Sequence, residues 1–192
     1  MATITASRRE VPRWPSLLNR LFTDVRAAWL WLPLRLWLGY QWLEAAAHKV
    51  GNPAWTETGV ALKGFWTNAV SVPEGGRAPI AFDWYRSFIQ ALLDAEAYTW
   101  FAKLIAYGEL LIGIALIVGA LVGVTTFFAA FMNWNFMMAG SASTNPLLFV
   151  IAIGLLLAWR VAGLVGVDYA LFNRERLAGL FSKSRGRVPD NG

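Results

Sequence analysis

The chain has 192 residues, of which 57% are hydrophobic and 15% aromatic, with a mean hydropathy of +0.45 and a net charge of +5. A soluble domain of this length does not need so much apolar surface, so the composition indicates an integral membrane protein with one domain. The absence of cysteine excludes disulfides, thiol redox chemistry, cysteine-ligated iron–sulfur clusters and c-type haem, and a single histidine excludes a histidine-rich metal site or bis-histidine haem.

The charges are distributed unevenly along the chain. Residues 1–27 contain five arginines and two acids, residues 165–192 five basic residues and three acids, and residues 48–98 four basic residues and five acids. Under the positive-inside rule, this pattern predicts that both termini are cytoplasmic. Nucleic-acid binding by the basic ends is disfavoured, because these ends flank apolar segments and lack interleaved aromatic residues.

Residues 1–26 are predicted to form a basic cytoplasmic segment, without the apolar core of a cleavable signal. Four later segments approach the ~20 apolar residues that a membrane span requires. Their boundaries are about 27–47, 99–120, 121–139 and 146–167. The expected fold is therefore all-α, a transmembrane four-helix bundle over residues 27–172, followed by a polar cytoplasmic tail over 173–192.

The long connection between the first two spans is expected outside the cytoplasm. It contains two amphipathic stretches, residues 55–66 and 82–93, separated by the turn-rich sequence SVPEGGRAP. We expect two short helices here, lying on the outer leaflet or capping the bundle.

The predicted spans contain charged and polar residues. Inserting a charge at the bilayer centre costs ~2.5–3.5 kcal/mol of free energy, so each such residue needs a bonding partner or a functional role. At a rise of about 1.5 Å per residue, Arg35 lies ~12 Å above the inner boundary and Glu109 ~15 Å below the outer one. The two depths are similar, so the sequence predicts an Arg35–Glu109 ion pair. Asn133 of the third span is expected to join them. The alternative is a purely structural polar core that fixes helix register.

A second polar group lies at the outer end of the first span. Gln41, Glu44 and His48 follow an i, i+3, i+7 spacing and share one helix face, and Lys49 comes next. A histidine beside a carboxylate at the membrane boundary can exchange protons with a lipid-soluble carrier. The alternative is an interfacial histidine that Glu44 and water satisfy.

Three sequence elements resemble the DoxX/DoxD family of small four-helix bacterial and archaeal membrane proteins. They are RLWLGYQWLEAAAHKV, AYGELLIGIALIVGAL and the long segment that begins NFMMAGSASTNPLLF, and the resemblance covers residues 28–172. It implies a multi-pass protein of the bacterial or archaeal plasma membrane. Arg35, Lys49 and Glu109 match the family's first-helix arginine, its basic residue at the helix end and its GEL glutamate.

DoxD-type members are membrane subunits of a thiosulfate:quinone oxidoreductase that work with a separate subunit. The resemblance therefore implies a quinone-linked oxidoreductase with quinone, membrane lipid and another protein subunit as partners. Quinone reduction needs an apolar slot, hydrogen-bond donors to the carbonyls and a protonatable group. The candidate catalytic residues are Glu109, Arg35 and His48, and the candidate quinone-binding residues are Asn133, Tyr107, Glu44 and Lys49.

The chain carries no flavin or dinucleotide fingerprint, so the electrons for quinone reduction must come from the substrate or from a partner.

Two other functions remain open at this point. A non-catalytic accessory or scaffold subunit of a larger respiratory or photosynthetic complex is the main alternative. A small-molecule or lipid transporter is a third possibility, which four short helices would serve only as an oligomer.

Overall fold

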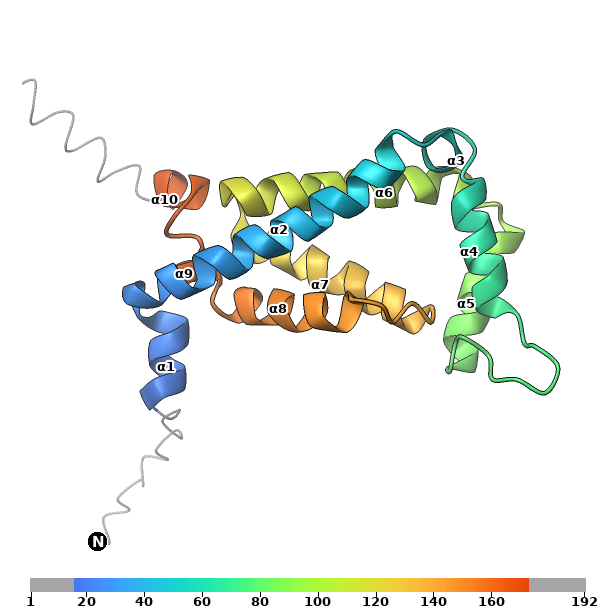
Figure 1. Cartoon of the computed structure of the whole chain (residues 1–192), viewed down its shortest axis with the longest axis horizontal. Helices are drawn as coiled ribbons and strands as arrows, with labels where there is room; N and C mark the ends of the chain where they lie inside the picture. Colours follow the sequence, from blue (N-terminus) through green and yellow to red (C-terminus); the bar gives the residue numbers. More distant parts are fainter. Residues whose placement is uncertain (1–15, 173–192) are drawn as a thin grey trace, which may run out of the picture.

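The computed structural model describes residues 16–172, and within that range all the regular structure is helical (Figure 1). The prediction of an all-α fold is confirmed. The body of the molecule consists of four helices: α2 (Ala28–Val50), α6 (Tyr98–Val118), α7 (Val122–Met138) and α8 (Asn145–Leu157). Shorter helices lie at the two ends of this bundle.

The bundle is built from two closely packed helix pairs, α2 with α6 and α7 with α8. Small residues allow this close approach between helix backbones. A Cβ atom added to Gly113 of α6 would lie 2.7 Å from the side chain of Leu43 in α2. Ala129 of α7 and Ala152 of α8 are fully buried. The approach of Gly113 to Leu43 fixes the register between α2 and α6, and this register decides which polar side chains of the two helices meet.

The junction between α6 and α7 is a tight turn. Gly119 adopts a left-handed conformation with φ of 69°, and Leu121 has φ of 49°. A side chain at Gly119 would be strained by this backbone and would also meet the guanidinium of Arg35 at 2.6 Å. From this turn, α6 and α7 diverge toward the opposite end of the molecule (Figure 1).

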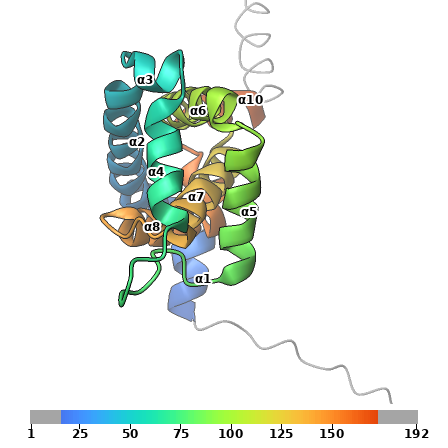
Figure 2. The ribbon, with the colours of Figure 1, turned by 90° about the vertical axis from the view of Figure 1, so that its right-hand side faces the viewer.

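Two helices of the long connection cover that opposite end. α4 (Val60–Val70) and α5 (Asp83–Asp94) lie side by side across the ends of the bundle helices (Figure 2). They follow the single-turn helix α3 (Pro53–Thr56). The prediction of two short helices is confirmed, although the first begins after Gly59 rather than at residue 55. Trp66 of α4 and Tyr85 of α5 are buried where this end cap packs on the bundle.

The prediction of four membrane spans is not confirmed. Of the helices in residues 16–172, α6 alone is long and apolar enough to cross a membrane by length and composition, with a mean hydropathy of 2.0. α7 and α8 have 17 and 13 residues, which is about 26 and 20 Å of helix against a hydrocarbon core of about 30 Å.

The predicted fourth span is divided rather than continuous. α8 ends at Leu157, the single turn α9 (Trp159–Ala162) follows, and α10 (Val167–Phe172) is a separate helix. The carbonyls of Ala162 and Val165 accept hydrogen bonds from the Arg35 guanidinium of α2, so this side chain holds the stretch between α9 and α10.

The segment before the bundle is partly helical. α1 (Ser16–Thr23) and the 3-10 turn η1 (Val25–Ala27) precede α2, and Trp31 donates a hydrogen bond to the carbonyl of Leu21 at 2.8 Å. α1 and α10 lie at the same end of the bundle (Figure 1). The predicted tail over residues 173–192 lies outside the described residues, as do residues 1–15.

Candidate functional site

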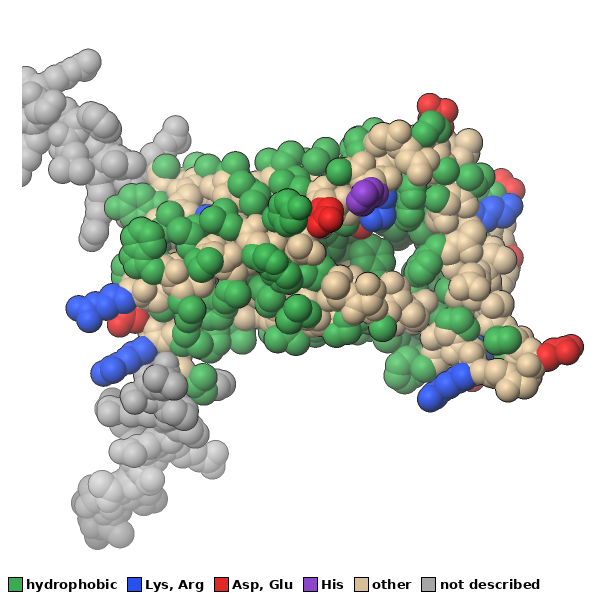
Figure 3. All heavy atoms as spheres, in the orientation of Figure 1, with side chains coloured by type: hydrophobic (Ala, Val, Ile, Leu, Met, Phe, Trp, Pro, Cys, Tyr) green, Lys and Arg blue, Asp and Glu red, His purple; other side chains and the backbone are tan. Residues whose placement is uncertain are grey.

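A polar cavity of about 460 Å³ lies between α2, α7 and α8, next to the end cap. In Figure 3, a small group of charged and histidine side chains interrupts the mainly apolar face at this place. Five of the residues predicted for the site line the cavity together. They are Glu44, His48, Lys49, Glu109 and Asn133.

An ion pair spans the interior of this cavity. The Nζ atom of Lys49 donates to Oε2 of Glu109 at 2.7 Å, and their side chains are 19% and 2% exposed. Lys49 also donates to the carbonyl of Ala45 at 3.2 Å and lies 5.3 Å from the centre of the Trp55 ring. The close packing of α2 on α6 brings this pair together, so the Glu109 carboxylate is buried but neutralised.

Asn133 is a buried polar residue of the cavity whose side chain lacks partners. Its side chain is completely buried, and within residues 16–172 neither its amide nitrogen nor its oxygen has a hydrogen-bond partner. The indole nitrogen of Trp42, which lines the same cavity, is also buried and unpartnered. Leaving a buried polar group unpaired costs roughly 1–3 kcal/mol. Such groups, facing a cavity, indicate a site for a polar molecule or group.

Glu44 and His48 form the accessible side of the site. Both are exposed on α2, whereas Glu109 and Asn133 lie inside. The predicted common face of these residues is confirmed, since Gln41 lines the cavity with them. The site therefore runs from titratable surface residues to a buried ion pair and a buried amide.

The prediction that Arg35 pairs with Glu109 is wrong. Arg35 is buried at the α6–α7 turn, where its guanidinium donates to the carbonyls of Ala162 and Val165, each at 2.6 Å. Lys49 takes its place beside Glu109. Fourteen residues separate Arg35 from Lys49, which is about 21 Å along a helix. The sequence-based estimate of depth placed Arg35 level with Glu109, because it assumed the residue at which each helix enters the membrane.

Tyr107 does not line the cavity either. Its side chain is half-exposed on the outer face of α6, two residues and therefore about 200° around the helix from Glu109. Tyr107 therefore lies apart from the other predicted residues that line the cavity.

Asp168 belongs to a buried cluster that sequence reasoning missed. Its carboxylate accepts hydrogen bonds from the backbone amides of Leu121 and Val122 at 2.6 and 2.8 Å, at the beginning of α7. Its own amide donates to the carbonyl of Gly119. An acid in an otherwise apolar segment was the available signal. The cluster ties α10 to the α6–α7 turn, which is a structural role.

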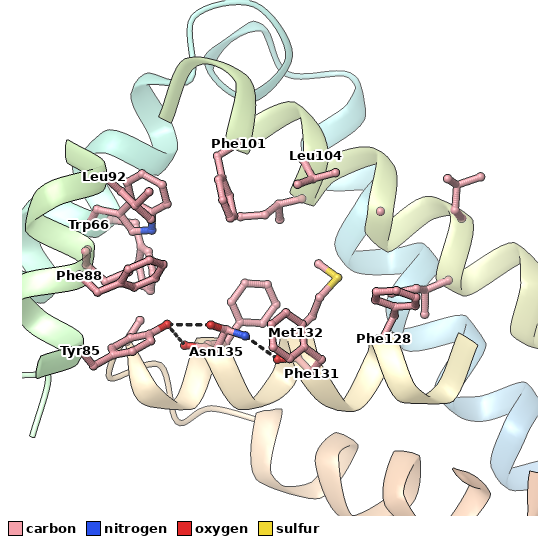
Figure 4. Close-up of a pocket in the computed structure, with 18 of the residues that line it drawn as sticks. Trp66, Tyr85, Phe88, Leu92, Phe101, Leu104, Phe128, Phe131, Met132 and Asn135 are labelled. Carbon is pink, nitrogen blue, oxygen red and sulfur yellow. Dashed lines mark hydrogen bonds between the residues drawn. The ribbon is translucent and has the colours of Figure 1, made fainter. Parts of the chain in front are cut away.

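A second cavity, of about 510 Å³, lies between α6 and α7 under the end cap (Figure 4). Aromatic and aliphatic side chains from α4, α5, α6 and α7 line it. Inside, the hydroxyl of Tyr85 lies 3.0 Å from Oδ1 of Asn135, and burial raises the pKa of Tyr85 to about 12. Sequence reasoning did not identify this cavity, although the density of phenylalanine in residues 127–136 was a signal.

Comparisons with models of protein families, with curated proteins and with solved structures give no match for this chain.

Proposed function

We propose that this chain is the membrane subunit of a quinone-linked oxidoreductase and that it binds the quinone headgroup in the polar cavity. The observation that carries the proposal is the buried, unpartnered amide of Asn133 beside the Lys49–Glu109 ion pair. A quinone ring is small and carries two carbonyl oxygens that accept hydrogen bonds. The DoxX/DoxD resemblance adds thiosulfate as the source of electrons and a separate subunit as partner.

The proposal places the bundle in the plasma membrane, with both termini cytoplasmic and α2, α6, α7 and α8 in the lipid. Besides α6, the outer faces of the other bundle helices support this placement. Large apolar residues are about half-exposed or more on each of them, a surface that water does not favour. Examples are Trp29 and Leu30 on α2, Phe127 and Phe128 on α7, and Leu147 and Val150 on α8.

The residues of the cavity suit both redox forms of the ligand. The Asn133 amide nitrogen and the Lys49 ammonium can donate to the carbonyls of the oxidised ring, and the Asn133 oxygen can accept from a quinol hydroxyl. Reduction of the quinone consumes two electrons and two protons. In this proposal thiosulfate is oxidised and its electrons reach the quinone through the partner subunit, and the protons come through His48 and Glu44 at the accessible side.

Binding is testable on the purified protein in lipid nanodiscs. A tail-less benzoquinone should quench tryptophan fluorescence, because Trp42 and Trp55 line the cavity. We expect Asn133→Ala to raise the Kd at least tenfold. Asn68→Ala is the matched control, since Asn68 is exposed on α4. Absence of saturable quenching in the wild type, or an unchanged Kd in Asn133→Ala, would refute the proposal.

A second measurement separates a catalytic subunit from an accessory one. Glu109→Gln keeps the side chain's size but removes its charge. If the site takes part in the reaction, complexes purified with this variant should contain the partner subunits and lack quinone-dependent turnover. Normal turnover in those complexes would favour a scaffold role.

A further inference from the structure

We propose that the apolar cavity between α6 and α7 holds the isoprenoid tail of the quinone whose ring occupies the polar cavity. This inference rests on the proposed function and extends it, because it assigns a binding site to the hydrocarbon part of the substrate. It also predicts the route by which the substrate arrives.

The chemistry of the lining fits a hydrocarbon chain. Among the residues that the structure describes, no charged side chain lines this cavity. Three residues with hydroxyl or amide groups do, and each is already engaged within the protein. Tyr85 bonds to Asn135, Asn135 donates to the carbonyl of Phe131, and Thr125 donates to the carbonyl of Ala120. The contrast with Asn133 is clear, since here no hydroxyl or amide side chain is left without a partner.

The two cavities are adjacent. Phe65 of α4 and Phe136 of α7 line both. Phe136 follows Asn133 by three residues, so the two lie on neighbouring positions of one helix face. On α6, Glu109 lines the polar cavity and Gly108 the apolar one. The proposal therefore places the ring in one cavity and the tail in the other, with the Phe65 and Phe136 side chains at the boundary between them.

The apolar cavity has a rim of exposed apolar side chains along α6 and α7. Leu104 and Leu111 of α6 and Val124, Phe128 and Phe131 of α7 line it, and each is at least half-exposed. Figure 4 shows Phe128, Phe131 and Leu104 around the space between the two diverging helices. A rim of this kind admits a ligand from an apolar phase, so we infer lateral access from the bilayer.

Gly108 provides the test. A Cβ atom added at this position would meet only the sulfur of Met132, at 3.8 Å, so alanine fits without strain. A phenylalanine would extend into the cavity and occupy the space of the tail. We expect Gly108→Phe to raise the Kd of a prenylated quinone at least tenfold and to leave the Kd of a tail-less quinone within twofold. Gly108→Ala should bind both ligands as the wild type does.

The possible outcomes distinguish failure of the tail site from failure of the proposed quinone-linked function. If prenylated quinone binds Gly108→Phe as tightly as it binds the wild type, the tail lies elsewhere and the inference is overturned. If neither quinone binds the wild type, the proposed function fails. If a prenyl alcohol then still binds and Gly108→Phe weakens it, the cavity takes hydrocarbon chains from a lipid instead, which also overturns the quinone-tail assignment.

A labelling experiment tests the tail site in the wild-type protein, without any substitution. A prenylated quinone with a diazirine at the end of its tail should, after illumination, label peptides of α5, α6 or α7 that line the cavity. Labelling confined to the outer surfaces of α2 and α8 would contradict the inference. Excess tail-less quinone should reduce the labelling, because both ligands share the ring site.

Discussion

Replacing Lys49 with methionine removes the cation that lies 2.7 Å from the Glu109 carboxylate, which is 2% exposed and accepts no other hydrogen bond from residues 16–172. At an effective dielectric constant of about 20, the lost attraction is about 6 kcal/mol. Measured costs of removing one partner of a buried pair are lower, about 3–5 kcal/mol. Because Lys49 is 19% exposed, we expect Lys49→Met to destabilise the protein by about 3 kcal/mol.

The reverse substitution should cost less. In Glu109→Gln, Lys49 keeps its hydrogen bond to Ala45 and its position beside the Trp55 ring, and it reaches solvent. We expect a loss of about 1 kcal/mol. The double variant Lys49→Met, Glu109→Gln buries no unpaired charge, so its stability should return to within about 1 kcal/mol of the wild type.

These free energies are measurable by reversible unfolding in mixed micelles, with the denaturing detergent as the titrant. The exposed pair Asp83–Arg86 on α5 supplies a matched control, and Asp83→Asn should leave the unfolding midpoint unchanged. If Lys49→Met and Glu109→Gln cost the same, or if the double variant is less stable than Lys49→Met, the asymmetry inferred from burial is wrong.

Three further predictions concern other parts of the fold. Asp168→Ala removes the acceptor of two amide hydrogen bonds at the start of α7 and should lower the free energy of unfolding by about 2 kcal/mol in the same assay. Asp168→Asn should lower it less, because the asparagine oxygen still accepts a hydrogen bond. Gly119→Ala forces a side chain into a left-handed backbone and against Arg35, so it should destabilise the protein by at least about 1 kcal/mol. The raised pKa of Tyr85 favours its neutral form in the folded state, while an unfolded tyrosine ionises near pH 10, so stability should fall as the pH rises from about 10 to 12. Tyr85→Phe should lack that part of the fall, and an identical pH profile in this variant would contradict the assignment.

The sequence alone determined the helical character of the chain and most of the polar site. Long apolar segments with few helix breakers predict the four bundle helices to within a few residues, except where α8 stops early. The spacing of Glu44 and His48 on one helix face predicts their shared cavity, because helical periodicity is a local property of the chain. Glu109 and Asn133 stood out as polar residues within apolar segments, and both line that cavity.

Only the tertiary structure decided which charge neutralises which. Arg35 and Lys49 are both cations on α2, and composition does not distinguish them as partners for Glu109. The register between α2 and α6 makes that choice, and contacts such as Gly113 against Leu43 set the register. The apolar cavity likewise arises because α6 and α7 diverge beneath the end cap (Figure 1). Such features depend on the summed packing of residues far apart in the chain, which no local pattern encodes.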